Sequence, residues 1–355
     1  MPSVLPKSTL QVRPRIAVEV RPEGVYAASS PDDAGVLSVV ALAPLASGAL
    51  VPSLKVGNVV DRVAVIAALR KTLNAVQVGK KRDVTLIIPD TAVRVLLLDF
   101  DELPSKTEEA LAVVRFRLAK LLPFSADHAQ VSYQVMSRHA LVLQVLVVAV
   151  PDEVLAEYES AVREAGFEPG AVLPSTLAVA AAVDPAGQAA SLVVNGSEFA
   201  VTTAILRRGE LLLHRTLELK PDVMAEAAGG TSQESANAVV DAAVNAQLAQ
   251  DFGDRSDVAV ADVVHAGALA AANDSTRVEQ DLLQAVSVAT AYYEDSLNIA
   301  PEKVLTAGTL SPSALQAMMP EMGWTVEDVL SPEDMLVTTS ISPGLLAGVR
   351  GALKN

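Results

Sequence analysis

Hydrophobic residues in the first quarter of the chain form short runs followed by one helical repeat. The runs predict three strands, at 16–20, 25–28 and 36–42. After a loop rich in Pro, Gly and Ser, apolar residues recur every three or four positions from Val59 to Val76, which indicates an amphipathic helix. Its apolar face is expected to contain Val59, Val63, Ile66, Leu69 and Leu73. The apolar segment 84–88 ends at a proline and predicts a fourth strand.

The same order of elements recurs in the second half of the chain. Three more strands are predicted at 191–195, 199–206 and 211–217, and turn-forming spacers separate them. A long helix at 278–297, a strand at 303–306 and a helix from Ser313 follow. Three strands followed by helices therefore occur twice, which predicts two related lobes that face one another.

Between these two series lies an additional unit, at 92–166. A strand at 93–100 leads to Ser105–Glu108, which fits a capping box at the start of a helix. The buried stripe of this helix is expected to be Leu111, Val114, Leu118 and Leu121. Two strands (131–136 and 140–150) and a helix from Pro151 to Gly166 complete a β-α-β-β-α module, with Phe167 packing back on the last turn. The Ala-rich segment 221–277 is expected to be helical in parts.

Composition removes several classes of function. The chain has 355 residues and no cysteine, which excludes disulfides, thiolate catalysis and cysteine-ligated zinc. The four histidines have no metal-binding spacing. A net charge of −15 argues against nucleic acid and against direct docking on an anionic membrane. No apolar run is long enough to span a bilayer and residues 1–10 lack a secretion signal, so we expect a cytoplasmic protein that a partner holds at any membrane.

Several short sequence segments, in the same order along the chain, resemble segments of the PilM family and of its relative FtsA, the cell-division actin homologue. The first runs from Leu103-Pro104 to the helix that ends in Lys120-Leu121-Leu122-Pro123-Phe124. The second joins the strand 147–151 to Ala165-Gly166-Phe167. The others are Ala291–Glu294 followed by Val304–Gly308, and the closing segment 344–353. The resemblance covers about Arg15 to Leu353.

The resemblance implies an α/β, actin-like fold, that is, a two-lobed fold with duplicated ribonuclease H-like lobes and a small inserted subdomain of the FtsA/PilM type. It divides the chain into a first lobe (1–91 and 167–190), the inserted subdomain (92–166), a second lobe (191–340) and a closing helix on the first lobe (341–355). It also implies an adaptor role in type IV pilus assembly, or in a related secretion system. The partner would be the short cytoplasmic tail of a PilN-like, single-span inner-membrane protein, alongside other pilus assembly proteins.

Actin-like ATPases hold Mg²⁺ and phosphates with two glycine-bearing hairpin turns, each preceded by an aspartate. At the first turn this chain has Glu19 in place of the aspartate and Arg21 in place of the glycine. Pro22 removes a backbone donor, Glu23 adds a negative charge, and Tyr26 stands where a lysine is usual. The first turn therefore departs from the family pattern at each of these positions.

The second turn keeps Gly196, beside Ser197, but has Val194 in place of the aspartate. The adenosine-side glycine pair is Ala307-Gly308. We therefore expect a degenerate pocket without catalytic residues, without a resident metal and without ATP hydrolysis, in which weak binding of ATP with Mg²⁺ stays open. The alternative is an active actin-like ATPase or a small-molecule kinase.

The predicted partner-binding surface is the helix and corner near 114–124. Its residues are Arg115, Phe116, Arg117, Leu122 and Phe124. Together with the neighbouring strands they would line a groove for an extended peptide. The alternative is that Phe124 is a core residue and that the two arginines belong to a solvated face.

Overall fold

The computed structural model describes residues 13–139, 142–184, 189–219, 272–298, 301, 303–320 and 323–354. The expectations for 1–10 and for most of 221–277 lie outside the described residues. The chain forms two compact units. The larger contains residues 1–93, 153–218 and 285–355, and the smaller contains 94–152 and 219–284. No helix in the described ranges is long and apolar enough to cross a membrane.

The first sheet of the larger unit contains the four strands that the apolar runs predict, and a fifth. Its antiparallel part is β1 (Ile16–Arg21), β2 (Gly24–Ser29) and β3 (Val39–Pro44). β4 (Asp83–Ile88) and β8 (Glu168–Pro174) add in parallel, and the order is β3-β2-β1-β4-β8. The third strand starts at Val39, three residues later than expected.

The second sheet of the larger unit repeats this topology. β9 (Ser191–Gly196), β10 (Ala200–Arg207) and β11 (Glu210–Glu218) are antiparallel. β12 (Lys303–Gly308) and β13 (Thr325–Asp328) add in parallel, in the order β11-β10-β9-β12-β13. Two sheets with the same strand order confirm the predicted duplication and the actin-like fold.

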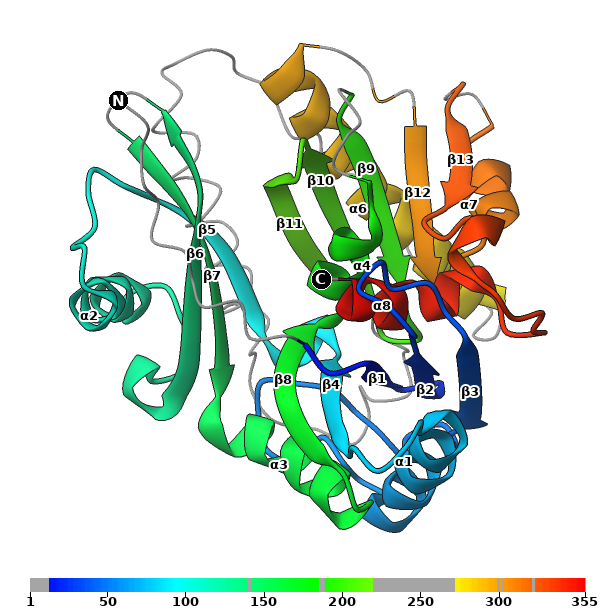
Figure 1. Ribbon diagram of the computed structural model, residues 1–355. Helices are drawn as coiled ribbons and strands as arrows, with labels where there is room; N and C mark the ends of the chain where they lie inside the picture. Colours follow the sequence, from blue (N-terminus) through cyan, green and yellow to red (C-terminus); the bar gives the residue numbers. More distant parts are fainter. Residues whose placement is uncertain are drawn as a thin grey trace. The chain divides into compact units, whose positions relative to one another are not determined.

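Two helices lie between these sheets (Figure 1). α4 (Ser175–Ala182) and α8 (Pro343–Leu353) pack against each other; α8 contacts β1, β2 and β12, and α4 contacts β8 and β10. α8 is the predicted closing helix, and all its residues from Leu346 to Leu353 are buried. The helices therefore bring the carboxyl ends of β1 and β9 into one core.

Further helices belong wholly or in part to the larger unit. They are α1 (Arg62–Val76), α3 (Asp152–Glu164), α6 (Ala272–Leu297), α7 (Pro312–Met318) and the short 3-10 helices η1 (Asp90–Ala92) and η4 (Pro332–Asp334). α1 buries Val65, Leu69 and Leu73, whereas Val63 is 80% exposed, so the predicted apolar face was partly wrong. The helix starts only at Arg62, capped by Asp61, which places Val63 in the first turn toward solvent.

The end of α3 confirms the predicted glycine motif. Gly166 has φ +95°, and the Phe167 N–H donates to the Val162 carbonyl. Phe167 is buried against the helix, as expected. α3 itself groups with the larger unit, where Arg62 bonds to Ser160 and Tyr158 donates to Asn58, so the observed grouping differs there from the range 92–166.

The described part of the smaller unit contains a three-stranded antiparallel sheet that packs against the helix α2. The strands β5 (Arg94–Phe100), β6 (Ala129–His139) and β7 (Val142–Pro151) have the order β5-β7-β6. α2 (Thr107–Leu118) packs Val114 and Leu118 on one face of the sheet, beside η2 (Ala126–His128). The predicted buried stripe is confirmed, because Leu111 and Leu121 also pack against this core.

The predicted capping box is wrong. The N-cap of α2 is Lys106, and no side chain bonds to the first turn. Residues 105–109 are exposed, so water satisfies the free N–H groups there and no capping side chain is needed.

Candidate functional site

The two hairpin turns that the sequence singles out lie in the larger unit, at the ends of β1 and β9. In the first, Arg21 pairs with Gly24, so Pro22 and Glu23 form a two-residue loop. In the second, Gly196 pairs with Val201, and the Ser197 N–H donates to the Ala200 carbonyl over 2.8 Å. Because both sheets have the same topology, the two turns are equivalent points of the two lobes.

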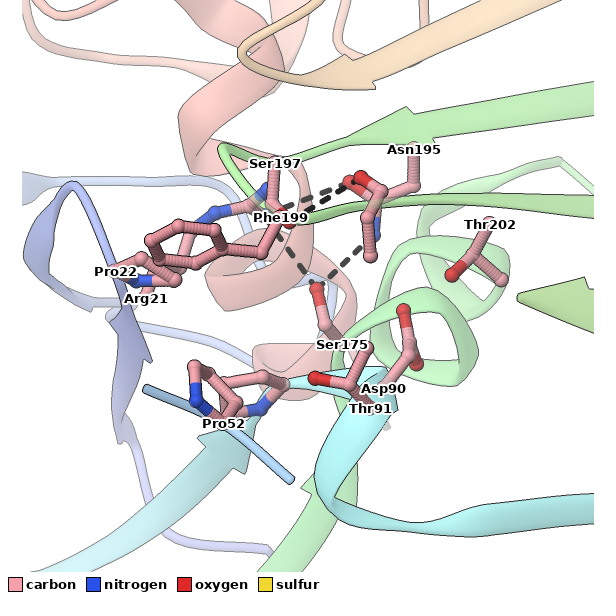
Figure 2. Close-up of a pocket in the computed structure, with 12 residues that line it drawn as sticks. Arg21, Pro22, Pro52, Asp90, Thr91, Ser175, Asn195, Ser197, Phe199 and Thr202 are labelled. Carbon is pink, nitrogen blue, oxygen red and sulfur yellow. Dashed lines mark hydrogen bonds between the residues drawn. The ribbon is translucent and has the colours of Figure 1, made fainter. Parts of the chain in front are cut away.

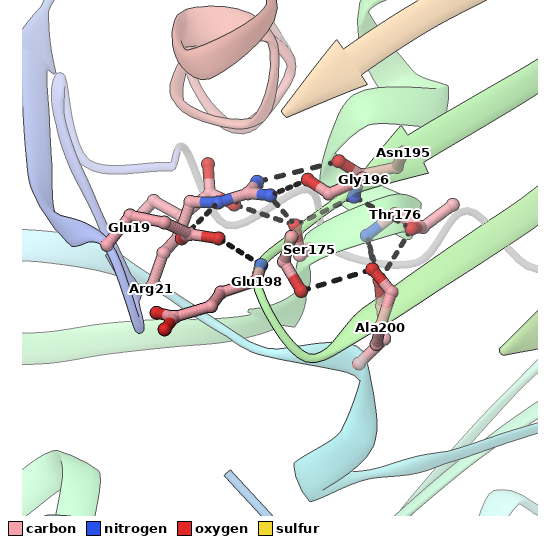
Figure 3. A network of polar contacts seen from close by, with 11 residues as sticks. Glu19, Arg21, Ser175, Thr176, Asn195, Gly196, Glu198 and Ala200 are labelled. Carbon is pink, nitrogen blue, oxygen red and sulfur yellow. Dashed lines mark hydrogen bonds and ion pairs between the residues drawn. The ribbon is translucent and has the colours of Figure 1, made fainter. Parts of the chain in front are cut away.

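The side chain of Arg21 reaches from the first turn to the second. Arg21 extends from the first turn, and its Nη2 donates to the Gly196 carbonyl of the second (Figure 3). Its Nη1 donates to Glu19 Oε1 over 2.9 Å and lies 3.5 Å from Ser175 Oγ and from Asn195 Oδ1. Arg21 is only 3% exposed. The cation that replaces the glycine of the family pattern is therefore an internal bridge between the lobes.

Glu23 makes a second bridge between the same turns. Its Oε1 accepts from the Glu198 N–H of the second turn, and its Oε2 lies 3.5 Å from Arg21 Nε. Backbone N–H groups in such turns are donors that bind anions. A carboxylate of the chain itself therefore occupies a donor that a phosphate oxygen would need. The sequence predicted an added negative charge at Glu23, and the structure pairs that charge with Arg21.

Four polar residues of the network, Ser175, Thr176, Asn195 and Asp90, were not singled out from the sequence. Ser175 Oγ donates to Glu19 Oε1 over 2.6 Å, and Asn195 Nδ2 donates to Ser175 Oγ and to Thr176 Oγ1 over 3.0 and 2.9 Å. The signal that would have found two of them is Pro174-Ser175-Thr176, a proline and two small hydroxyl residues directly before an Ala-rich segment. Such residues are typical of a helix start.

Asp90 closes the network on the side of the first sheet. Its carboxylate accepts from the Thr176 N–H over 3.0 Å and from Thr176 Oγ1 over 2.6 Å. His214 Nε2 lies 3.9 Å from Asp90 Oδ1. Burial lowers the pKa of His214, and the negative charge of Asp90 opposes that change only in part. His214 is thus a neutral residue at neutral pH and fits the structural role expected for the histidines.

The electrostatics of the pair Glu19–Arg21 are those of a buried ion pair. Burial raises the pKa of the Glu19 carboxyl, while Arg21 and the hydrogen bond from Ser175 hold that rise back. Arg21 keeps its charge because the carboxylates of Glu19 and Glu23 raise its pKa against the effect of burial. Glu19 Oε2 has no hydrogen-bond partner in the described part of the chain. Glu19 is therefore held by Arg21 and Ser175 and has no open side toward solvent.

Two glycines explain how the surrounding elements approach so closely. Gly308, at the end of β12, has φ +72°, and a Cβ there would collide with the Gly196 carbonyl, Arg21 Nη2 and Asn195 Oδ1. A Cβ on Gly348 of α8 would collide with the Glu19 carboxylate. Gly308 belongs to the predicted adenosine-side pair, but in this structure its missing side chain makes room for the arginine.

The remaining predicted pocket residues lie in the strands and turns around the site. Val194 is buried and pairs with Thr306, and Ala307 is buried and pairs with Asn195. Ser197 is half-buried, and its Oγ donates to the Ala200 carbonyl. Tyr26 is buried in β2, where burial raises its pKa to about 12. None of these side chains projects a charge into the space between the turns.

The space left between the turns is small. Figure 2 shows the cavity, which has a volume of about 20 Å³. Its polar lining comes from Arg21, Asp90, Thr91, Ser175, Asn195, Ser197 and Thr202, and Pro22, Pro52, Pro89, Phe199 and Ala200 complete it. A volume of roughly 10–15 Å³ holds one water molecule. The cavity therefore has room for about one water, far less than a triphosphate requires.

The residues present do not fit a magnesium nucleotide at this position. The described residues contain no cluster of His, Asp or Glu that would hold a metal ion. The Glu198 N–H of the second turn donates to Glu23, and Arg21 donates to the Gly196 carbonyl, so these donors already have acceptors within the chain. An arrangement in which charges are already paired can hold two lobes together, but it offers no open group to a phosphate.

The predicted partner-binding residues differ in exposure and in what they contact. Arg115 donates to the carbonyls of Ala126 and Ala129, and Leu122 and Phe124 pack against the core of the smaller unit. Phe116 is 72% exposed, with Lys120 Nζ 5.6 Å from its ring centre, and Arg117 is half-buried. The core alternative therefore holds for Phe124, and Phe116 is the residue of the set that presents an apolar surface.

Comparison with known proteins gives one strong similarity of fold. No protein-family model matches the sequence, and a search of curated proteins gives no match. Among solved structures, the chain is similar to the PilM-PilN type IV pilus biogenesis complex, with a TM-score of 0.69 at 17% identity over 96% of this chain and 98% of the matched chain. The ethanolamine utilization protein EutJ from Carboxydothermus hydrogenoformans has a TM-score of 0.43 at 11% identity, covering 96% and 89% of the two chains. MreB 5 of Spiroplasma citri bound to AMPPNP has a TM-score of 0.38 at 11% identity, covering 96% and 95%. The chain has the PilM-like, actin-like fold that the sequence resemblance implied.

Proposed function

We propose that this protein is a cytoplasmic adaptor of a type IV pilus or a related secretion apparatus, held at the inner membrane by the tail of a PilN-like partner, and that it works without hydrolysing ATP. The observation that carries the adaptor role is the similarity to the PilM–PilN complex along nearly the whole of both chains. The residues between the two turns support the second part, because Glu23 occupies a backbone N–H that a phosphate oxygen would need and the Arg21 cation is already bonded to Glu19 and the Gly196 carbonyl.

The surface proposed for the partner tail is the outer side of α2. Phe116 is a large exposed apolar side chain, and a polar rim formed by Arg117 and Lys120 accompanies it. Aromatic residues, Phe among them, are enriched at protein interfaces relative to the rest of the surface. Arg115, Leu122 and Phe124 then serve the site indirectly, because they fix the corner that follows the helix.

The experiment is a binding titration with a synthetic N-terminal tail of a PilN-like protein, followed by fluorescence anisotropy. We expect saturable binding, and we expect Phe116→Ala to weaken it about tenfold, the loss of about 1.4 kcal/mol. Val63→Ala is the matched control, because Val63 is an even more exposed apolar residue in the larger unit. That variant is expected to bind like the unmodified chain.

Two results would count against the proposal in different ways. Absence of binding at high micromolar tail concentration would contradict the adaptor role. Binding that Phe116→Ala leaves unchanged would keep that role and remove α2 as its site.

The alternative function, an active actin-like ATPase or a small-molecule kinase, needs an open carboxylate and an open phosphate turn. In this chain the only carboxylates at the first turn, Glu19 and Glu23, are both bonded to Arg21 or to backbone. The paired state of these groups is the reason that we favour the adaptor.

A further inference from the structure

The strand β6 forms a free edge of the sheet in the smaller unit. It is the last strand in the order β5-β7-β6 and is 11 residues long. Among the described strands, only β7 pairs with β6, so no described strand lies on its outer side. Its backbone N–H and C=O groups on that side are therefore available to another strand.

Natural edge strands usually carry a feature that prevents pairing with another chain, such as Pro, Lys or an inward-facing charge. The sequence of β6, AQVSYQVMSRH, contains no Pro, Lys, Asp or Glu. Its exposed outer-face residues, Gln130, Ser132 and Gln134, are polar and uncharged. The one interruption is a bulge at Met136, close to the end of the strand. Most of the edge therefore lacks a barrier to pairing.

The core face of the same strand is incompletely covered. Val131, Tyr133 and Val135 lie on it, opposite Ala149, Val147 and Val145 of β7. Their burial decreases along the strand: Val131 is buried, Tyr133 is half-buried and Val135 is 41% exposed. An additional strand beside β6 would remove apolar surface of Tyr133 and Val135 from water, which is favourable.

The charges at the two ends of the edge identify the occupant. Exposed Asp127 precedes β6 and exposed Arg138 lies near its end, and neither has an ion-pair partner within the described residues. We propose that the occupant is a second copy of this chain, whose β6 pairs antiparallel with the first about a twofold axis at Ser132. Such an axis places Gln130 opposite Gln134 and Val131 opposite Tyr133. Antiparallel pairing also brings the end of each β6 beside the start of the other, so Arg138 of each copy then lies near Asp127, in the η2 that precedes the other strand.

The test uses the position on the axis, where each side chain lies opposite its own copy. The unmodified full chain is expected to show a concentration-dependent dimer in analytical ultracentrifugation. Ser132→Lys and Ser132→Glu are each expected to be monomeric, because directly opposed side chains lie roughly 5 Å apart and like charges repel. An equimolar mixture of the two variants is expected to regain the dimer, as a heterodimer.

Controls separate this pairing from misfolding and from other surfaces. Ser132 is exposed, so at a concentration low enough for the unmodified chain to be monomeric, both variants are expected to have its melting temperature. Asn74→Lys, an added charge on the exposed side of α1, is expected to leave the dimer unchanged. A monomer at all concentrations, a dimer that both Ser132 variants retain, or a mixture that stays monomeric would overturn the proposal. Binding of the partner tail is measured separately, and its outcome does not bear on β6.

Discussion

Arg21 belongs to a buried ion pair, and its presence and its removal have different effects on the free energy of unfolding. A buried ion pair loses the hydration of both partners, so its net contribution to stability is small even when its geometry is good. Removal of one partner is different, because the other remains buried without compensation, at a cost of about 3–5 kcal/mol. Arg21 holds Glu19 and the Gly196 carbonyl at once, and both are buried. Truncation of this one side chain therefore affects two lobes.

We expect Arg21→Ala to lower the stability of the larger unit by about 3–5 kcal/mol, measured by urea unfolding. The vacated space matches a guanidinium ion, so guanidinium chloride, added far below denaturing concentration, is expected to raise the melting temperature of this variant. The unmodified chain, tested in parallel, is expected to show no rise. An equal response of both proteins would contradict the role of Arg21 as a bridge.

The sequence indicated the altered residues at the first turn but not what they contact. Glu19, Arg21 and Glu23 were recognised because they replace small or acidic residues of the family pattern. The bonds from Arg21 to Gly196 and from Glu23 to Glu198 each join residues 175 positions apart. Contacts of that separation depend on how the two sheets face each other, which no local pattern encodes. Asn195 was overlooked for the same reason.

At the scale of elements, the strands with uninterrupted apolar runs were predicted within a few residues. β8 was missed because it begins Glu168-Pro169-Gly170, residues that are unfavourable in strands. Its parallel pairing with β4 provides the order that its sequence lacks. The boundary of α1 was wrong because Val59 and Val63 continue the apolar repeat although they precede or begin the helix. Tertiary pairing decided these cases against local propensity.

The short helix η4 has no buried residues, and hydrogen bonds hold it in place. The Ser331 N–H and Oγ donate to Asp334 Oδ2, and Arg350 of α8 donates twice to Asp334 Oδ1. Backbone bonds join the same segment to Leu37. Burial alone would raise the pKa of Asp334, but these hydrogen bonds and the Arg350 charge lower it overall. Asp334 thus links η4 to α8.

This lowered pKa gives a pH dependence with a defined sign. An aspartate whose folded-state pKa lies below its unfolded value contributes stability that is fully present above about pH 4 and is lost as the pH falls through the folded pKa. Asp334→Asn is expected to be less stable than the unmodified chain at pH 7. The difference is expected to shrink in acid, when melting temperatures are compared from pH 7 to pH 3. A difference that grows toward low pH would contradict this assignment.

At the scale of the whole molecule, the two sheets have the duplicated topology of the actin-like fold. Gly308, which has no side chain, lets β12 approach Gly196 and Arg21 closely. In this chain, Arg21 and Glu23 occupy the space between the two hairpin turns. A ligand present at 100 times its Kd stabilises a protein by about 2.7 kcal/mol. Even moderate binding of nucleotide would therefore be visible in a melting experiment.

We expect millimolar Mg-ATP to leave the melting temperature of the full chain unchanged, because the cavity holds about one water and its charges are paired. The measurement is a thermal shift with and without Mg-ATP, with magnesium alone as the control. A rise of several degrees that requires the nucleotide would contradict a closed site. Release of phosphate above the control would contradict the non-enzymatic function.

Arg21, which joins the two hairpin turns, is part of the chain itself. Its bond to the second turn forms when the chain folds, and every folded molecule contains it. A bound nucleotide is different, since it is exchanged, cleaved and sensitive to the ratio of ATP to ADP in the cell. A bond made by the chain's own Arg21 has no such cycle of exchange and cleavage. Under the proposed function, any timing that the apparatus requires comes from another component, and this chain supplies a fixed geometry to it.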